Sequence, residues 1–192
     1  FYRSAKKVWN LWSEDLQHFA PKDNSGKWAS PFDINVCRKD SWNDPYFYEG
    51  VSRSWTYNVQ ADFAGLVARC GGEVGFEQHL DRYFEDKKII AKETFMHIPY
   101  LYHYANRPDK SSKIVRRILS KAYKPERFGI PDNEDMGCHS AFYICGLLGI
   151  YPMMGQDWYF LVAPAFERSV IRLGQSGAEL IICLLYTSPS PR

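Results

Sequence analysis

Residues 131–152 read PDNEDMGCHSAFYICGLLGIYP, in which three carboxylates within four positions precede an apolar run. The apolar residues after Ser140 recur at helical spacing, so the sequence predicts a helix over about residues 135–148. Asp132 or Asn133 can cap such a helix, and acids near its start are favoured by the helix dipole by about 0.3–1 kcal/mol each. Capping explains one or two acids and leaves a carboxylate that could serve in catalysis.

A calcium-binding loop is a second interpretation of these acids, and it fails. With Asp132 as the first ligand, Met136 stands at the fifth ligand position and Tyr143 stands where the bidentate Glu is needed. Two interpretations therefore remain, a charged helix start and a catalytic carboxylate held at a helix N-terminus.

Helical periodicity recurs along most of the chain. It predicts further helices over residues 5–19, 55–69, 76–84, 97–105 and 110–123. Strand signals are scarce until after Pro152, where WYFLVAPAF and RSVIRL, within residues 158–173, are rich in β-forming residues. The sequence thus predicts a mainly α fold of about six paired helices, with β-strands beginning near the C-terminus.

A long polar segment, residues 19–50, separates the first predicted helix from the next. It is rich in Pro, Gly, Asp and Trp. Long loops within a compact domain are uncommon and are often functional.

The bulk composition narrows the class of partner. The chain has 192 residues, a formal charge of +2 and 16% aromatic residues. The near-neutral charge gives no reason to expect nucleic acid, and no apolar run reaches the roughly 20 residues of a membrane-spanning helix. The aromatic content suits a carbohydrate cleft, and it equally suits a tyrosine-rich core.

The cysteines indicate neither a zinc site nor a disulfide. Cys37, Cys70, Cys138 and Cys145 form no CxxC pair. The last two would lie about two helical turns apart, too far for a disulfide. We expect all four to be buried thiols.

Both ends of the sequence suggest a fragment. The chain opens on Phe1 without a signal-peptide pattern, so the compartment of the parent protein is left open. The final ten residues, CLLYTSPSPR (183–192), can be read codon for codon from a common transposase sequencing adapter. We expect the natural sequence to stop near Ile182; the alternative is an ordinary Ser/Pro-rich terminus.

Two further acids have surroundings that suit a functional site. Glu93 precedes an aromatic-rich segment and is followed by His97, which could hold the carboxyl in a partly apolar pocket with a raised pKa, as a general acid requires. The alternative is a solvated Glu at a helix start. Glu49 lies in YFYEG, between aromatic residues and Gly50.

Taken in order, the segments of this chain resemble glycoside hydrolase family 92, the calcium-dependent α-mannosidases. The resemblance runs from about residue 4 to residue 173 and rests on the series FAPKDNSGKWASPFD, YFYEG, SWTYNVQADFAGLV, GGEVGFEQHLDRYF, HIPYLYHYANRP, IVRRILSKAY, DNEDMGCHSAFYICGLLGIYP and FLVAPAF. Each piece is weak alone, whereas their order and spacing are specific.

The resemblance implies a fold and an activity. Residues 1–173 would form the later part of a C-terminal (α/α)6 barrel, and residues 174–182 would begin a truncated β region. The N-terminal β-sandwich domain of the same chain would be missing. The whole enzyme would be a secreted, periplasmic or cell-surface inverting exo-α-mannosidase acting on mannose-containing glycans or glycoproteins, with α-1,2-linked mannose of N-glycans as the expected substrate. The isolated fragment would be inactive and poorly stable.

The resemblance also implies roles for single residues. Glu93 takes the place of the general acid and Asp135 that of the general base, and in an inverting enzyme two such carboxyls lie roughly 6.5–9.5 Å apart. His97, Trp55 and Asn133 would bind substrate; Asn133 stands where some members carry a further Asp. The family's Ca²⁺ would have Glu49 as a ligand.

Departures from the family pattern gather around this implied site. Val51 and Ser54 replace the Asn and Gln near the metal, and Arg53 adds a positive charge. Lys92 replaces the Asn before the acid, and Cys138 replaces a Gln after the base. The departures leave three hypotheses open: a divergent mannosidase, a non-catalytic glycan-binding relative, and a hydrolase with another sugar specificity.

Overall fold

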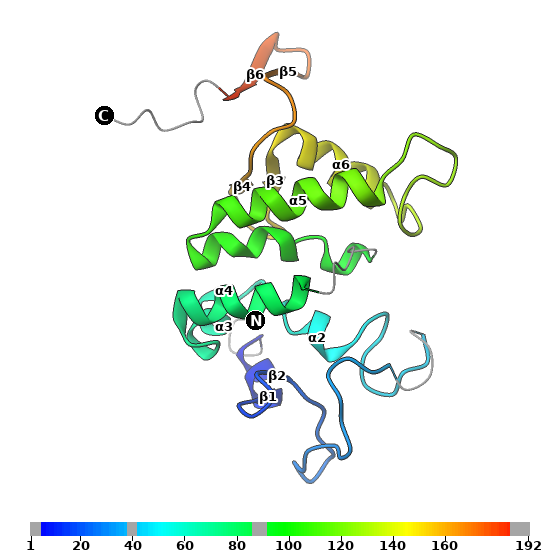
Figure 1. Ribbon diagram of the computed structural model, residues 1–192, viewed down its shortest axis with the longest axis vertical. Coiled ribbons are helices and arrows are strands. Elements are labelled where there is room, and N and C mark those ends of the chain that lie inside the picture. Colours follow the sequence, from blue (N-terminus) through cyan, green and yellow to red (C-terminus); the bar gives the residue numbers. More distant parts are fainter. Residues whose placement is uncertain (1–4, 38–41, 86–91, 185–192) are drawn as a thin grey trace. The chain divides into compact units, whose positions relative to one another are not determined.

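The computed structural model describes residues 5–37, 42–85 and 92–184 (Figure 1). The chain divides into two compact units. Unit 1 comprises residues 1–88 and 94–106, and unit 2 comprises residues 89–93 and 107–192. The short 3-10 helix η2, Glu93–Phe95, lies where the chain passes from unit 2 to unit 1.

Unit 1 is built mainly from short helices. In chain order its elements are η1 (Lys6–Leu11), β1 (Trp12–Ser13), β2 (His18–Phe19), α2 (Ser52–Trp55), α3 (Phe63–Arg69), α4 (Gly72–Phe84) and η3 (Ile98–Ala105). Helix α4 packs against both α3 and η3. Its buried face carries Phe76, His79, Leu80 and Tyr83, spaced by three and four residues as an amphipathic helix requires.

Local sequence explains where these helices begin and end. The carboxylate of Asp62 accepts a hydrogen bond from the Gly65 amide at 2.9 Å and so caps α3. Gly71, at φ +89°, turns the chain directly from α3 into α4. Asn106, in the left-handed conformation, ends η3.

Two predicted helices of unit 1 are wrong in part. The helix expected over residues 5–19 stops at Leu11, because a turn closed by the Gln17 amide on the Ser13 carbonyl leads into the β1–β2 hairpin. The helix expected over residues 55–69 is interrupted between Trp55 and Phe63, where Asp62 starts a new helix. Helices over residues 76–84 and 97–105 are confirmed, the second with 3-10 geometry.

The predicted long loop is confirmed. In its described parts, residues 20–37 and 42–50, the only strand-like pairing is an isolated bridge between Lys22 and Trp28.

Unit 2 contains two helices followed by strand pairs. Helix α5 (Pro108–Ala122) packs on α6 (Cys138–Leu148), and β3 (Ile150–Pro152), β4 (Tyr159–Leu161), β5 (Arg168–Leu173) and β6 (Ala178–Cys183) follow. The pairs β3–β4 and β5–β6 are antiparallel, with Tyr151 opposite Phe160 and Ile171 opposite Leu180. The strands predicted after Pro152 are thus confirmed.

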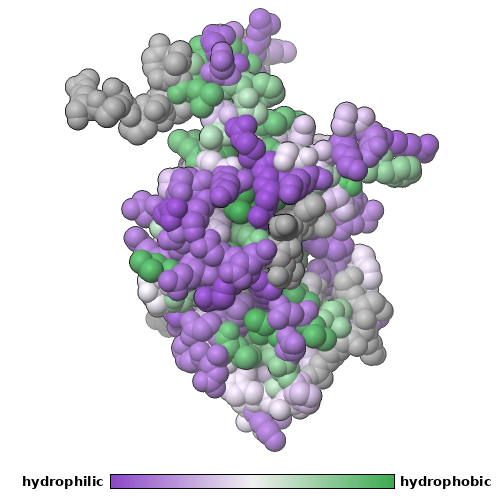
Figure 2. Space-filling view, in the orientation of Figure 1, coloured by the Kyte–Doolittle hydropathy of each residue, from purple (hydrophilic) through white to green (hydrophobic). Residues whose placement is uncertain are grey.

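The predicted amphipathic helix over residues 110–123 is confirmed as α5. Ile114, Val115, Ile118 and Leu119 are buried, and the side of α5 turned toward the viewer is hydrophilic (Figure 2). The close approach of α6 depends on Gly146, since a Cβ there would lie 2.9 Å from Leu119 Cδ1.

Helix α6 begins later than the sequence suggested. It starts at Cys138 because Asp135, Met136 and Gly137 all have positive φ angles, +40°, +58° and +86°. Three consecutive left-handed residues cannot belong to a right-handed helix.

The mainly α class is confirmed, and the (α/α)6 barrel stays a prediction. Within the described parts of the chain, no helix is long and apolar enough to cross a membrane. All five cysteines are free, and only Cys70 is buried; Cys37, Cys138 and Cys145 are half-exposed, so the expectation of four buried thiols is wrong for these three. Residues 185–192, most of the predicted adapter, lie outside the described residues.

Candidate active site

The loop before α6 gives its three acids three different environments. Asp132 pairs with Lys92, whose Nζ lies 2.7 Å from the Asp132 Oδ2. The other oxygen, Oδ1, accepts a hydrogen bond from the Asn133 amide at 2.9 Å. The hydrogen bond from Lys92 is the main reason that the pKa of Asp132 lies below its ordinary value. The carboxylate of Asp132 is therefore engaged in an ion pair with Lys92.

Glu134 caps the helix that follows. Its Oε1 accepts a hydrogen bond from the Ser140 amide at 3.0 Å, and its carbonyl accepts one from the Cys138 amide at 2.9 Å. The bond from Ser140 lowers the pKa of Glu134. The sequence suggested Asp132 or Asn133 as the cap, and that assignment is wrong: the N-cap residue is Gly137, and the left-handed turn at residues 135–137 lets the Glu134 side chain reach the first turn of α6.

Asp135 is the remaining acid. It is exposed, and among the described residues its carboxylate makes no hydrogen bond or ion pair. Its φ of +40° is uncommon for a residue other than Gly, although a short Asp side chain tolerates it. Strained backbone gathers at functional sites. The loop thus presents one uncommitted carboxylate to solvent.

The second predicted catalytic acid, Glu93, is joined to this loop through its neighbour. Lys92, directly before Glu93, makes the 2.7 Å ion pair with Asp132, three residues before Asp135. Both segments belong to unit 2. Glu93 is half-buried, and its carboxylate also has no hydrogen bond or ion pair among the described residues. The structure therefore brings together the two segments that carry Glu93 and Asp135.

Sequence reasoning missed a pair, of one buried histidine and a half-buried tyrosine, that lies close to this loop. The hydroxyl of Tyr123 lies 3.0 Å from Nδ1 of His139, which is fully buried in the first turn of α6. His139 is also close enough to contribute to the lowered pKa values of Asp132 and Glu134. The position of His139, close to the acids of residues 132–135 in the sequence, could have indicated this pair.

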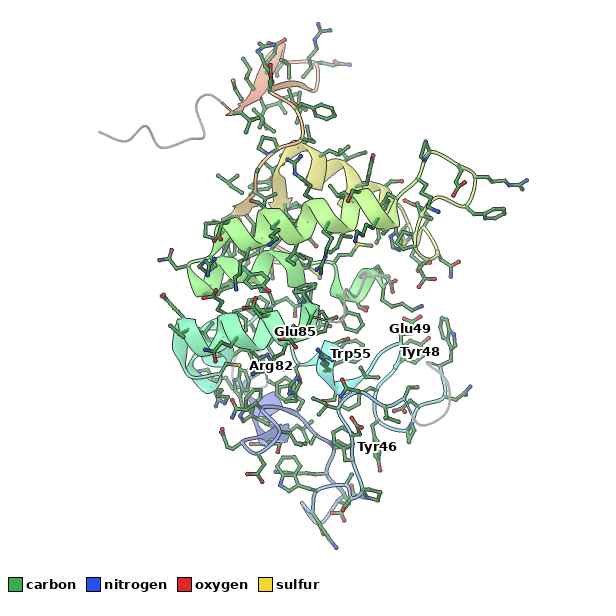
Figure 3. The ribbon with its side chains drawn as sticks, viewed as in Figure 1. Tyr46, Tyr48, Glu49, Trp55, Arg82 and Glu85 are labelled. Atoms are coloured by element: carbon green, nitrogen blue, oxygen red, sulfur yellow. The ribbon has the colours of Figure 1, made fainter. Side chains whose placement is uncertain are left out.

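Glu49 and Trp55, predicted to bind metal and substrate, lie in unit 1. Figure 3 shows Tyr48 and Glu49 on the segment that leads into α2, with Trp55 at the end of that helix. The Trp55 indole donates to the Tyr48 carbonyl at 2.8 Å and packs edge-on against Phe95, with ring centroids 5.4 Å apart. The indole is thereby fixed in one orientation.

The surroundings of Glu49 do not make a calcium site by themselves. Ca²⁺ takes six to eight oxygen ligands, and the described residues contain no group of three or more His, Cys, Asp or Glu that could hold a metal. Arg53 follows instead, and its guanidinium donates to Asn35 Oδ1 and to the Arg82 carbonyl. Glu49 as a ligand stays a prediction, and no catalytic step is assigned to a metal.

His97 is part of the interior of unit 1. Its side chain is buried, its Nε2 lies 2.9 Å from the Tyr57 carbonyl, and burial lowers its pKa to about 4. This geometry favours a role in holding the core, and the sugar contact expected of His97 stays a prediction. Asn133, expected to bind substrate, is exposed in the loop before α6.

A second buried histidine lies in the same unit. His79 packs against His18 with ring centroids 4.6 Å apart and the rings tilted by 33°, and its Nδ1 lies 2.8 Å from the Tyr57 hydroxyl. Burial lowers the pKa of His79 to about 3. These histidines are neutral members of a packed core.

Comparison with known proteins gives a consistent result. The model of the glycosyl hydrolase family 92 catalytic domain matches residues 1–188. A protein of Arthroderma benhamiae described as an uncharacterized secreted glycosidase is 29% identical in an alignment of 162 residues that covers 80% of this chain and 21% of that protein.

Solved structures agree in fold. A family GH92 α-mannosidase from Bacteroides thetaiotaomicron superposes with a TM-score of 0.79 at 24% identity, over 94% of this chain and 24% of its own. A family GH92 inverting mannosidase from the same organism gives 0.77 at 26% identity, over 94% of this chain and 27% of its own. The chain therefore spans about a quarter of the length of these relatives.

Proposed function

The chain belongs to glycosyl hydrolase family 92, and from this membership we propose that it forms part of an inverting exo-α-mannosidase. The expected substrates are mannose-containing glycans and glycoproteins, with α-1,2-linked mannose first among them. The names of the solved relatives, an α-mannosidase and an inverting mannosidase, support this choice.

The uncommitted carboxylate of Asp135 is the observation that carries the proposal. Of the three acids in its loop, Asp132 is paired with Lys92 and Glu134 caps α6. A general base must accept a proton from water, so it has to be ionised and accessible. Asp135 is the acid of this loop whose carboxylate is exposed and makes no hydrogen bond or ion pair among the described residues.

In the proposed mechanism Glu93 protonates the glycosidic oxygen while Asp135 removes a proton from water. The water attacks the anomeric carbon on the face opposite the leaving group, so the configuration inverts. Glu93 suits the role of the acid because its carboxyl group is half-buried and makes no other hydrogen bond or ion pair among the described residues. Lys92 and Asp132 would hold the two segments in register.

The test uses the full-length protein that contains this chain, with α-1,2-mannobiose as substrate. We expect Asp135→Asn and Glu93→Gln each to lower kcat by about 10²–10⁴-fold, the usual contribution of acid–base catalysis. Proton NMR during turnover should show β-mannose as the first product. Normal turnover in either variant, or α-mannose appearing first, would contradict the assignment.

Glu134→Gln is the matched control, since it alters an acid of the same loop that is bound to the helix end. We expect it to lower stability and to keep most of the turnover. An equal loss of turnover in Glu134→Gln and Asp135→Asn would mean that the whole loop was disturbed.

The second candidate function is glycan binding without hydrolysis. The altered residues near Glu49 favour it. Arg53, bound to Asn35 and Arg82, lies where the family resemblance places metal ligands. A non-catalytic glycan-binding protein would show mannobiose binding in calorimetry with no release of mannose.

Secretion or display at the cell surface is proposed as well. It is supported by the relative described as a secreted glycosidase. Recovery of the full-length protein from the culture medium or the periplasm of its source would test it.

A further inference from the structure

A second sugar-binding site is inferred from a pocket in the long loop of unit 1. The pocket measures about 320 Å³ and is lined by residues within 22–30 and by Tyr46, none of which is a predicted catalytic acid. Its walls combine two aromatic rings with charged side chains, contributed by Lys22, Asp23, Lys27, Trp28 and Tyr46.

The loop that forms the pocket is held in one conformation by its own hydrogen bonds. The Asp23 carboxylate accepts from the Ser25 amide and hydroxyl and from the Lys27 amide, at 2.6–3.0 Å. The Asp23 amide donates to the Lys27 carbonyl at 2.9 Å, and Gly26, at φ +84°, completes the turn. A turn held in this way preorganises its side chains, so less conformational entropy is lost when a ligand binds.

The two aromatic residues are partly exposed. Trp28 keeps 38% of its surface accessible and Tyr46 keeps 40%. Lys22 fixes the indole of Trp28, with its Nζ 3.8 Å from the ring centroid, and the same ammonium donates to the Asn10 carbonyl at 2.8 Å. In Figure 3 Tyr46 lies on the loop apart from Tyr48, Glu49 and Trp55. An exposed indole held in place is suited to bind the flat face of a ligand.

The charges of the pocket identify the class of ligand. The carboxylate of Asp23 is ionised, since its hydrogen bonds, first that from Ser25, lower its pKa. It lies in the same pocket as the ammonium groups of Lys22 and Lys27, and an apolar ligand would remove these charged groups from water without replacing their hydrogen bonds. A neutral sugar offers hydroxyls to both the ammonium and the carboxylate groups, and C–H faces to Trp28.

We propose that Trp28, Tyr46 and the charged side chains of this pocket bind a neutral α-mannan chain, in addition to the sugar bound at the predicted catalytic acids. Such a site would hold a polymeric glycan during successive cleavages. The choice of α-mannan rests on the proposed function, whereas the site itself consists of other residues and requires no turnover.

The test measures retention of the full-length protein by neutral yeast α-mannan in affinity gels. We expect Trp28→Ala to weaken binding by at least about fivefold, as truncation of a central aromatic residue commonly does. Trp28→Phe should keep part of the affinity. Tyr46→Ala provides a second variant whose effect does not depend on the folding of Trp28→Ala.

Two variants serve as controls. Trp42→Ala removes another exposed tryptophan of the same loop, 56% accessible, that is not part of this pocket, and it should bind mannan normally. Asp135→Asn should also bind mannan, whether or not the protein proves to be a mannosidase. The experiment can therefore show that the proposed hydrolytic function is wrong without affecting the proposal for this pocket, and the reverse.

Unchanged mannan binding in Trp28→Ala and Tyr46→Ala would overturn the proposal. Equal losses in Trp28→Ala and Trp42→Ala, or in Trp28→Ala and Asp135→Asn, would also overturn it, since the loop or the catalytic site would then be responsible. Binding that disappears at high ionic strength would contradict a neutral ligand.

Discussion

At the scale of single residues, Gly50 shows how packing constrains the segment that carries Glu49. Gly50 lies directly beneath two aromatic rings. A Cβ at this position would lie 2.7 Å from Phe95 Cζ and 3.0 Å from Trp55 Nε1. Rings are rigid and cannot give way as a flexible side chain can. The glycine next to Glu49 is therefore required by packing.

Gly50→Ala should lower the free energy of unfolding by about 1–3 kcal/mol, the usual cost of overpacking. The measurement is urea unfolding of the full-length protein. Phe95→Leu makes room for the added methyl group, so the double variant should lose less stability than the sum of the two single variants. Additive losses would show that the clash with Phe95 is not the cause.

At the level of elements, helix α4 and the segment that begins η3 each bring a neutral histidine into unit 1. His79 and His97 are 3% exposed, and burial lowers their pKa values to about 3 and about 4. In the unfolded chain both would titrate near 6.5. The unfolded state therefore binds more protons over the interval between these values.

The free energy of unfolding should accordingly fall as the pH is lowered from about 6.5 toward 4. The two histidines together give a slope of up to roughly 2.7 kcal/mol per pH unit. Urea unfolding between pH 7.5 and pH 5, where carboxylates contribute little, measures it. His79→Gln and His97→Gln should each reduce the slope, and an unchanged slope in both would contradict this explanation.

On the scale of the whole molecule, apolar side chains are exposed on several elements of unit 2. Ile144 on α6 is 55% accessible and Ile181 on β6 is 51% accessible. The relatives are about four times as long as this chain. In the full-length protein we expect further segments to cover these residues, because exposed apolar surface of this kind favours association.

The 192-residue chain by itself should therefore be inactive on mannobiose and should bind a dye specific for apolar surface. Its thermal unfolding should be broad, whereas the full-length protein should unfold cooperatively. A cooperative transition of the isolated chain, with resistance to proteolysis, would contradict this expectation.

The position of a helix could be predicted from the sequence where a single stripe of apolar residues at helical spacing defines it. The spacing of Ile114, Val115, Ile118 and Leu119 is visible in the sequence, and α5 forms there. Residues 5–19 have a comparable pattern and do not form one helix, because the Ser13–Gln17 turn starts a hairpin. The periodicity of apolar residues indicates which side chains are buried. It does not by itself distinguish a helix from a short hairpin that buries the same residues.

The sequence by itself determined the family, the mainly α class and the two candidate acids, Glu93 and Asp135. These depend on the order of residue types along the chain. The tertiary structure alone distinguished the acids of one loop: Asp132 pairs with Lys92 from a distant segment, Glu134 caps α6, and Asp135 is left accessible. Identical carboxylates acquire different roles from their partners, and the partners are brought together only by folding.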